Sequence, residues 1–188
     1  MAPRIAESVK QDHREIEACY IRMVNTSDKD EQTRFKNLFT WELARNLVAE
    51  EIVVYPALEK HVQGGTTLAN KNREQHQKIK EQLKTFQSLG PSDQGFIPTL
   101  DTLMQDLRQH MREEEINDLG ILEEAMSSHD SQNLSKWFNR AKIFLPSRAH
   151  PSAPSKPPFE TAVGLLTAPV DQVGDLFRKW PHKSQVAV

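Results

Sequence analysis

Five residues of this sequence have side chains that commonly bind metals, at positions predicted to face a helical core. They are His13, Glu50, His76, His110 and Glu114. Neutral imidazoles together with carboxylates suit iron, manganese or zinc. A lone buried carboxylate is costly unless it is paired or bound to a metal, whereas one cation would compensate several such groups. If these side chains converge, their types therefore predict a metal site.

Each of these residues also has a simpler interpretation when it is taken alone. A histidine in an apolar stripe more often hydrogen-bonds a neighbour than binds a metal. Glu50 and Glu114 stand beside other glutamates, so either could belong to a solvated helix face. The conjunction favours the metal site, because each of four successive predicted helices carries at least one such side chain within its apolar stripe.

Apolar residues recur at steps of three and four along most of the chain, and glycine is scarce, which predicts helices. The predicted helices span residues 5–24, 30–62, 68–88, 97–126 and 131–144. We expect a bend at Pro56, because proline has no backbone donor, and an irregularity at Gly120. Four long helices with short connections predict an all-α, up-down-up-down four-helix bundle with one extra helix.

The sequence is also predicted to divide into three parts. Residues 1–145 would form the bundle. The segment 146–158 is rich in proline and serine, which is typical of a linker. Residues 159–188 would form a C-terminal tail, helical as far as Trp180 but broken at Pro169. The apolar residues of the tail favour docking on the bundle or on a protein partner.

The composition argues against several functional classes. A chain of 188 residues that is 37% hydrophobic and 27% charged suits a helix-rich globular domain. Its formal net charge of −2 gives no electrostatic reason to expect nucleic acid or anionic lipid as a partner. The single cysteine, Cys19, rules out an intrachain disulfide, and neither a signal sequence nor a membrane span is evident. We expect a cytoplasmic protein without nucleic-acid or membrane partners.

Four motifs together resemble the hemerythrin-like, HHE cation-binding family, most closely its fungal-type members. The motifs are D-H-x-x-I from Asp12, W-E-L-A-R-N-x-V-A-E-E-x-x-x-Y-P from Trp41, R-E-x-H-x-x-x-K from Arg73 and H-M-R-E-E-E from His110. They occur in the family's order and cover residues 5–145. The C-terminal stretch G-L-L-T-A-P-V-D-Q-V-G-D-L-F-R-K-W-P also resembles the tail that those proteins often carry.

This resemblance implies a non-haem di-iron centre. By the family pattern, His13 would bind one iron, and His76 and His110 would bind the other. Glu50 and Glu114 would bridge the two metals, with an open position for a hydroxide or an O₂-derived ligand.

Asn46 departs from the family pattern. The family has histidine four residues before the bridging glutamate, whereas Asn46 stands four residues before Glu50. A neutral amide is a weak ligand, so we expect a degenerate site. It would hold one metal well at His76 and His110, hold two weakly, or hold none and bind a small organic ligand instead. Asn72 is a second gap relative to the O₂-carrying hemerythrins.

Three functions remain open on the sequence alone. The first is a hemerythrin-like metal-binding protein, with iron as its cation, that binds or senses O₂ or iron. The second is a small-molecule tailoring enzyme, whose pocket would be lined by Tyr20, Phe39, Trp41 and the tail helix. The third is an interaction module whose tail recruits a partner protein.

Overall fold

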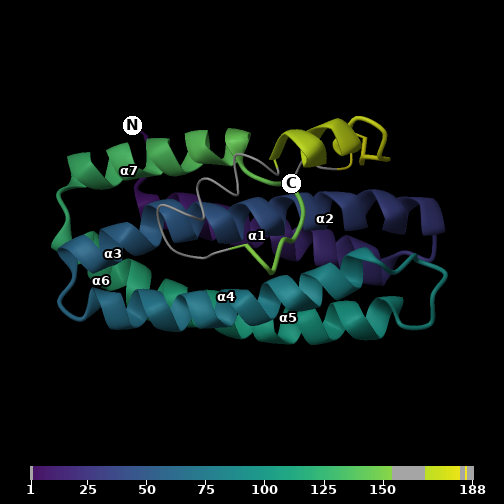
Figure 1. Cartoon of the computed structure of the whole chain (residues 1–188), viewed down its shortest axis with the longest axis horizontal. Coiled ribbons are helices and arrows are strands. Elements are labelled where there is room, and N and C mark those ends of the chain that lie inside the picture. Colours follow the sequence, from purple (N-terminus) through teal and green to yellow (C-terminus); the bar gives the residue numbers. More distant parts are fainter. Residues whose placement is uncertain (1, 154–167, 183–184, 186–188) are drawn as a thin grey trace.

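The computed structural model describes residues 2–153, 168–182 and 185, and every regular element within these residues is a helix (Figure 1). The elements of the bundle are α1 (Ile5–Asn25), α2 (Lys29–Ala49), η1 (Glu50–Val54), α3 (Tyr55–His61), α4 (Gly65–Gln87), α5 (Phe96–Glu113), η2 (Glu114–Asp118) and α6 (Leu119–Ala125). They are followed by α7 (Ser128–Ala141), by the short 3₁₀ helix η3 (Lys142–Phe144) and by a helix over residues 168–175.

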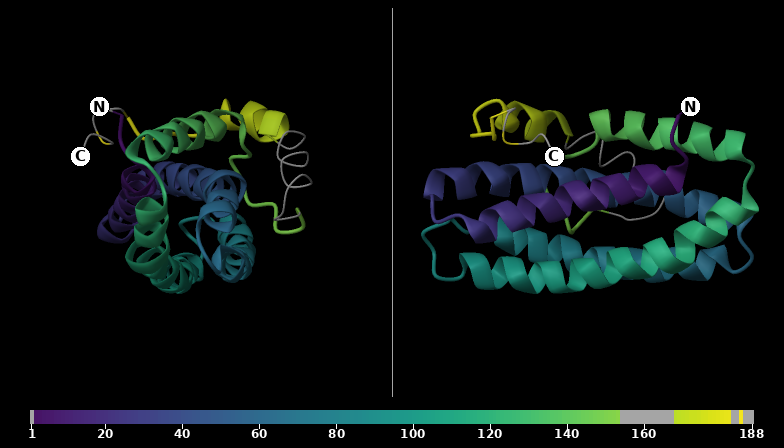
Figure 2. Two further views of the ribbon diagram at one scale, coloured as in Figure 1. Left: turned by 90° about the vertical axis from the view of Figure 1, so that its left-hand side faces the viewer. Right: turned by 180° about the vertical axis from the view of Figure 1, so that it is seen from behind.

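These elements form four antiparallel rods, because α2, η1 and α3 are continuous with one another, as are α5, η2 and α6. Seen end-on, α1, α4 and the two composite rods surround a common core, and α7 lies outside them (Figure 2). The helix α7 packs against α1 and η1. The prediction of an all-α, up-down-up-down bundle with an extra helix is confirmed.

Both composite rods contain one turn of π-helix. The N–H of Tyr55 bonds the carbonyl of Glu50, and that of Leu119 bonds the carbonyl of Glu114, each five residues back. The first wide turn precedes Pro56, where a donor is missing in any case. The irregularity predicted at Gly120 was misplaced, because the second wide turn begins at Glu114. Both π turns thus begin at a predicted metal-binding glutamate, and such turns are frequent at functional sites.

The turn between α3 and α4 depends on two glycines. Gly64 has φ of 78°, the left-handed region that glycine adopts without strain. A Cβ on Gly65 would lie 1.9 Å from the carbonyl oxygen of Leu58, so no other residue fits there. The second long helix, predicted to end at residue 62, ends at His61, and α4 begins at Gly65, three residues earlier than predicted.

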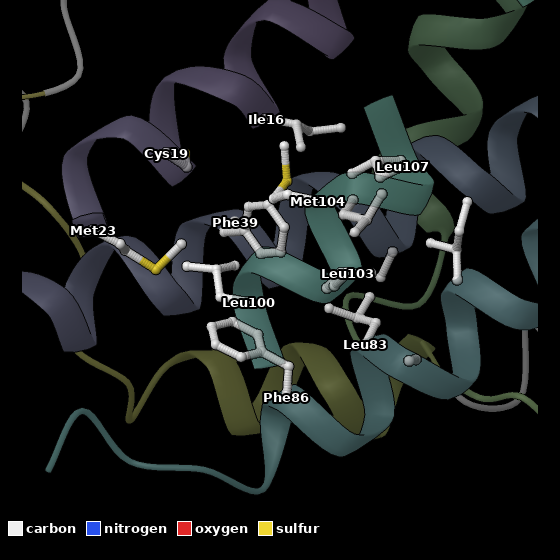
Figure 3. Close-up of a cluster of buried hydrophobic side chains, with 14 of the residues drawn as sticks. Ile16, Cys19, Met23, Phe39, Leu83, Phe86, Leu100, Leu103, Met104 and Leu107 are labelled. Carbon is white, nitrogen blue, oxygen red and sulfur yellow. The ribbon is translucent and has the colours of Figure 1, made fainter. Parts of the chain in front are cut away.

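The apolar core is divided into two clusters by a polar layer. One cluster gathers around Phe39, Phe86 and Leu103, which are all completely buried (Figure 3). The other includes Val9 and Tyr55, at the opposite end of the bundle. In α1, for example, His13 stands between Val9 of one cluster and Ile16 of the other. Two apolar clusters therefore enclose the polar layer.

The segment 146–153 is not helical and packs against the bundle, with Ala149 in the core cluster around Phe39. A hydrogen bond joins the helix over residues 168–175 to this segment: His150 Nε2 lies 2.9 Å from Asp171 Oδ2. Further along, Arg34 of α2 donates to the carbonyl of Trp180 at 2.7 Å. The predicted helical stretch 159–167 lies outside the described residues, so the three-part division stays a prediction. Within the described residues, no helix is both long and apolar enough to cross a bilayer.

Candidate metal centre

The five predicted metal-binding side chains meet in the polar layer between the two apolar clusters. They come from α1, η1, α4, α5 and η2, and none is more than 4% exposed. Their ligand atoms form two groups within which all atoms lie less than 4.8 Å apart: Glu50 with His76 and His110, and Glu50 with His13 and Glu114. We call these groups half-site A and half-site B, respectively. The two half-sites share Glu50.

Half-site A presents two imidazole nitrogens side by side. His76 Nε2 lies 3.0 Å from His110 Nε2 and 3.3 Å from Glu50 Oε2. Two nitrogen ligands about 2.1 Å from a metal and at right angles to each other would be about 3 Å apart. The facing imidazoles of half-site A therefore have the separation that neighbouring ligands of one cation require.

Half-site B has one imidazole and two carboxylates. His13 Nε2 lies 3.5 Å from Glu50 Oε1 and 3.6 Å from Glu114 Oε2. Glu50 thus turns one oxygen toward each half-site, which is the arrangement of a bridging carboxylate. Glu114 also approaches half-site A, since its Oε2 is 4.0 Å from His110 Nε2.

Asn46 lies in the same layer, 2% exposed, but it acts as a hydrogen-bond donor. Its Nδ2 donates to Glu50 Oε1 at 2.7 Å, the oxygen that faces half-site B. Asn46, which stands where the family has a metal-binding histidine, thus forms a hydrogen bond to the carboxylate of Glu50 that the two half-sites share. Half-site B has one imidazole where half-site A has two.

The far side of each imidazole ring is held by a hydrogen-bond partner. Nδ1 of His76 is 3.1 Å from Glu51, and Nδ1 of His13 is 2.8 Å from Glu115. Nδ1 of His110 lies 2.9 Å from Gln75 Oε1. Partners of this kind keep the proton on Nδ1 and leave the Nε2 lone pair free for a metal.

Sequence reasoning missed several residues of this layer. The hydroxyl of buried Tyr55 lies 2.7 Å from His76 Nε2. Lys80 donates to both oxygens of Glu51, at 2.6 and 2.7 Å. Tyr55 and Lys80 are both specified residues of the motifs quoted above, in the Y-P pair and in R-E-x-H-x-x-x-K. Their place in these motifs could have identified them as residues of the layer. Asn72, the second gap, donates to buried Asp118 at 2.7 Å.

Burial and mutual charge shift the ionisation of the layer in opposite directions. Burial, reinforced by the charge of Glu50, raises the pKa of Glu114 to about 8. Burial disfavours the charged form of His13, but the hydrogen bond to Glu115 and the nearby carboxylates of Glu50 and Glu114 outweigh it and raise the pKa of His13 to about 10. Burial, with the charge of His76, lowers the pKa of His110 to about 3. Without a cation, the layer therefore stores protons to balance its carboxylates.

Several buried atoms of the layer make no hydrogen bond to the described residues. They include both carboxylate oxygens of Glu114, Glu50 Oε2 and His13 Nε2. Native proteins rarely leave such groups unpaired. Because these atoms point into one small space and are electron-pair donors once a cation displaces their protons, the donor set fits one or two cations.

A fold of four antiparallel helical rods around buried histidines and carboxylates defines a class of cation-binding bundle proteins. The model of the hemerythrin HHE cation binding domain matches residues 4–122 of this chain. The chain belongs to this family.

Two further similarities were found. An uncharacterised hemerythrin-like protein of the fission yeast Schizosaccharomyces pombe is 45% identical over 179 residues, which cover 95% of this chain and 88% of that protein. The crystal structure of a hemerythrin HHE cation-binding domain-containing protein from Mycobacterium kansasii aligns with a TM-score of 0.65 and 17% identity. That alignment covers 75% of this chain and 86% of the other. At this identity it supports the fold alone.

Proposed function

We propose that this protein is a hemerythrin-like iron protein that responds to iron or O₂ through a site degenerate at Asn46. The observation that carries the proposal is the pair of half-sites sharing Glu50, enclosed between two apolar clusters. Two histidines and a carboxylate in half-site A, and one histidine and two carboxylates in half-site B, suit Fe²⁺, Mn²⁺ or Zn²⁺. The choice of iron rests on the hemerythrin resemblance. Bound iron would supply one-electron chemistry with O₂.

The chain's own residues would shape how such a site works. Glu51, Glu115 and Gln75 fix the imidazole rings by their Nδ1 atoms. Both apolar clusters exclude bulk water, which strengthens electrostatic interactions within the layer. Because half-site B has a single imidazole, binding or sensing is better supported than reversible O₂ carriage.

Metal analysis of the purified protein tests this proposal. We expect at least one iron per chain after expression in iron-supplemented medium, and less than a tenth of that in His76→Ala. His129→Ala is the matched control, because His129 is an exposed histidine of α7. Elemental analysis and the visible spectrum are the readouts, with circular dichroism to verify folding. A folded wild-type protein that takes up no metal would refute the proposal.

A common pocket lined by Tyr20, Phe39, Trp41 and the tail helix would have favoured the tailoring-enzyme alternative. Phe39 is completely buried in the core. Trp41 borders a cavity of about 390 Å³ on the outside of α2, and Tyr20 borders a separate polar hollow beside Asp101. The three side chains lie in different places, so the structure gives this alternative no support.

The protein partner expected for the tail remains a proposal, and we propose that it is a second copy of this chain. The helix over residues 168–175 turns its acidic side inward: Asp171 contacts His150, and Asp175 contacts Ser147 at 2.5 Å. Seven apolar side chains on this helix, on the turn that follows it and on the adjoining α7 and η3 are 59% to 87% exposed, namely Trp137, Ile143, Phe144, Val170, Val173, Leu176 and Phe177. Together they offer on the order of 1,000 Å², enough for one side of a standard interface of about 800 Å² per partner.

Light scattering over a range of protein concentrations tests this dimer. We expect a wild-type dimer and a monomeric Leu176→Asp variant, because a charge at this site would be buried unpaired. Ile121→Ser is the control, since Ile121 is an exposed isoleucine on α6. A wild-type monomer at every concentration would contradict the dimer.

A cytoplasmic location without nucleic-acid or membrane partners likewise stays a prediction.

A further inference from the structure

Two segments of the polar layer correspond to each other in sequence and structure. The segments N-L-V-A-E-E-I from Asn46 and H-M-R-E-E-E-I from His110 each pass into a π turn at their fifth residue. Glu50 corresponds to Glu114, and Asn46 corresponds to His110. This correspondence therefore offers a direct comparison of the two half-sites within one molecule.

The histidines that face these segments follow the same correspondence. His76 of α4 is held by Glu51, the residue after Glu50, and His13 of α1 is held by Glu115, the residue after Glu114. Each half-site thus has one histidine oriented by the second glutamate of an E-E-I segment.

The two orienting glutamates lie in very different surroundings. Glu51 is 1% exposed and is gripped at both oxygens by Lys80, itself 5% exposed. The side chain of Glu115 is 34% exposed, and within the described residues its ion pairs involve His13 alone. Four residues after His13, where Lys80 follows His76, the chain has Glu17, which pairs with Arg108 instead. The glutamate that orients His76 is therefore held in place and shielded from water, whereas the glutamate that orients His13 is accessible to water.

We infer that the half-sites load in order, half-site A first and half-site B second with weaker affinity, and that the Lys80–Glu51 pair sets this order as a positioning device. The inference rests on the proposed function and deepens it: one metal would be bound at low supply and two at high supply, so occupancy of half-site B would report metal availability.

Two physical reasons support this order. Half-site A offers two imidazoles 3.0 Å apart, one of them already fixed by a buried ion pair, so little ordering remains when a metal arrives. Half-site B offers one imidazole, and a metal there must compete with the Asn46 amide for Glu50 Oε1. Orienting partners of this kind typically change metal affinity about 10- to 100-fold.

Anaerobic titration of metal-free protein with Fe²⁺, and separately with Co²⁺ as a spectroscopic probe, against a competing chelator tests the order. We expect two binding events whose dissociation constants differ by about 100-fold. Glu51→Gln should weaken the first event, whereas the matched variant Glu115→Gln should weaken only the second. Lys80→Met should resemble Glu51→Gln, and Lys80→Arg should restore most of the first event.

A measurement on the metal-free protein makes the test independent of loading. Nitrogen-15 NMR of the histidine rings should give the same His76 ring shifts in the wild type and in Lys80→Arg, and different ones in Lys80→Met, because the contact between His76 and Glu51 changes when Glu51 loses its partner. Circular dichroism verifies that each variant is folded, and Lys80→Arg keeps the test informative if Lys80→Met does not fold.

The outcomes separate the inference from the proposed function. Three results would overturn the ordered loading but not the proposal of a metal-binding protein. They are two binding events of equal affinity, a single equivalent of bound metal, and a Glu51→Gln variant in which only the second event is weakened. A folded protein that binds neither metal would overturn both.

Discussion

Replacement of Asn46 by histidine is expected to raise the affinity of half-site B for metal at least about tenfold, equivalent to about 1.4 kcal/mol. The variant adds a second imidazole to the half-site that has one, and it removes the amide donor that caps Glu50 Oε1. The equivalent position in half-site A, His110, demonstrates that a histidine fits at this point of a rod entering a π turn. Bound iron per chain should approach two at metal concentrations at which the wild type holds one.

The control for this prediction is Asn46→Ala, which frees Glu50 without adding a ligand. If the alanine variant gains as much affinity as the histidine variant, release of the carboxylate is responsible and the ligand argument fails. Titration with Co²⁺ under chelator competition measures both variants on the same scale.

Metal-free protein is expected to lose stability as the pH rises from 6.5 to 8. Glu114, with its pKa raised to about 8, and His13, with its pKa raised to about 10, bind protons more tightly in the folded state than in the unfolded state. The unfolded chain therefore holds fewer protons in this window, and the free energy of unfolding falls with pH. Two groups acting together set an upper limit of about 2.7 kcal/mol per pH unit.

The acid side of the profile has the opposite sign. The pKa of His110 is lowered to about 3. The pKa of Glu50 is held below its usual range by His13 and His76, against the effect of burial. Both groups therefore resist protonation in the folded state. Their contribution is lost as the pH falls from 6.5 toward 3 for His110 and below 4.5 for Glu50. The metal-free protein should thus be most stable near pH 5 to 6.

Bound metal is expected to reverse the alkaline trend. Ligands must be deprotonated to bind a cation, so metal affinity, and with it the stability of the loaded protein, rises with pH. Thermal unfolding from pH 5.5 to 8.5, with chelator and with added Fe²⁺, should give curves of opposite slope. Parallel curves would show that the metal does not bind these groups.

A matched pair of variants assigns the metal-free trend to its source. Glu114→Gln should reduce the alkaline decline by about half, because the neutral amide loses no proton there while His13 still does. Glu113→Gln should leave it unchanged, since hydrogen bonds from Lys71, Gln109 and Gln75 lower the pKa of this partly exposed residue to about 2. An equal effect of both variants would locate the titration elsewhere.

Much of the polar layer was predictable because its histidines and glutamates repeat with the helical period. His13, His76 and His110 stand in apolar stripes, and a stripe identifies the face of a helix that turns toward the core. The structure does bring these side chains to one layer. Reasoning from the stripes located neither π turn correctly, because a wide turn leaves no mark on the periodicity of so short a segment.

The sequence by itself determined the class of fold and the residue types at its centre, since amphipathic helices, glycine stops and clustered ligand residues are local features. Only the tertiary structure decided which neighbours complete the layer. Lys80 meets Glu51, Glu115 meets His13, and Asn46 donates to the shared carboxylate rather than facing away from it. Two of these contacts join residues 29 and 102 positions apart, and such pairings are fixed by how the four rods pack and rotate.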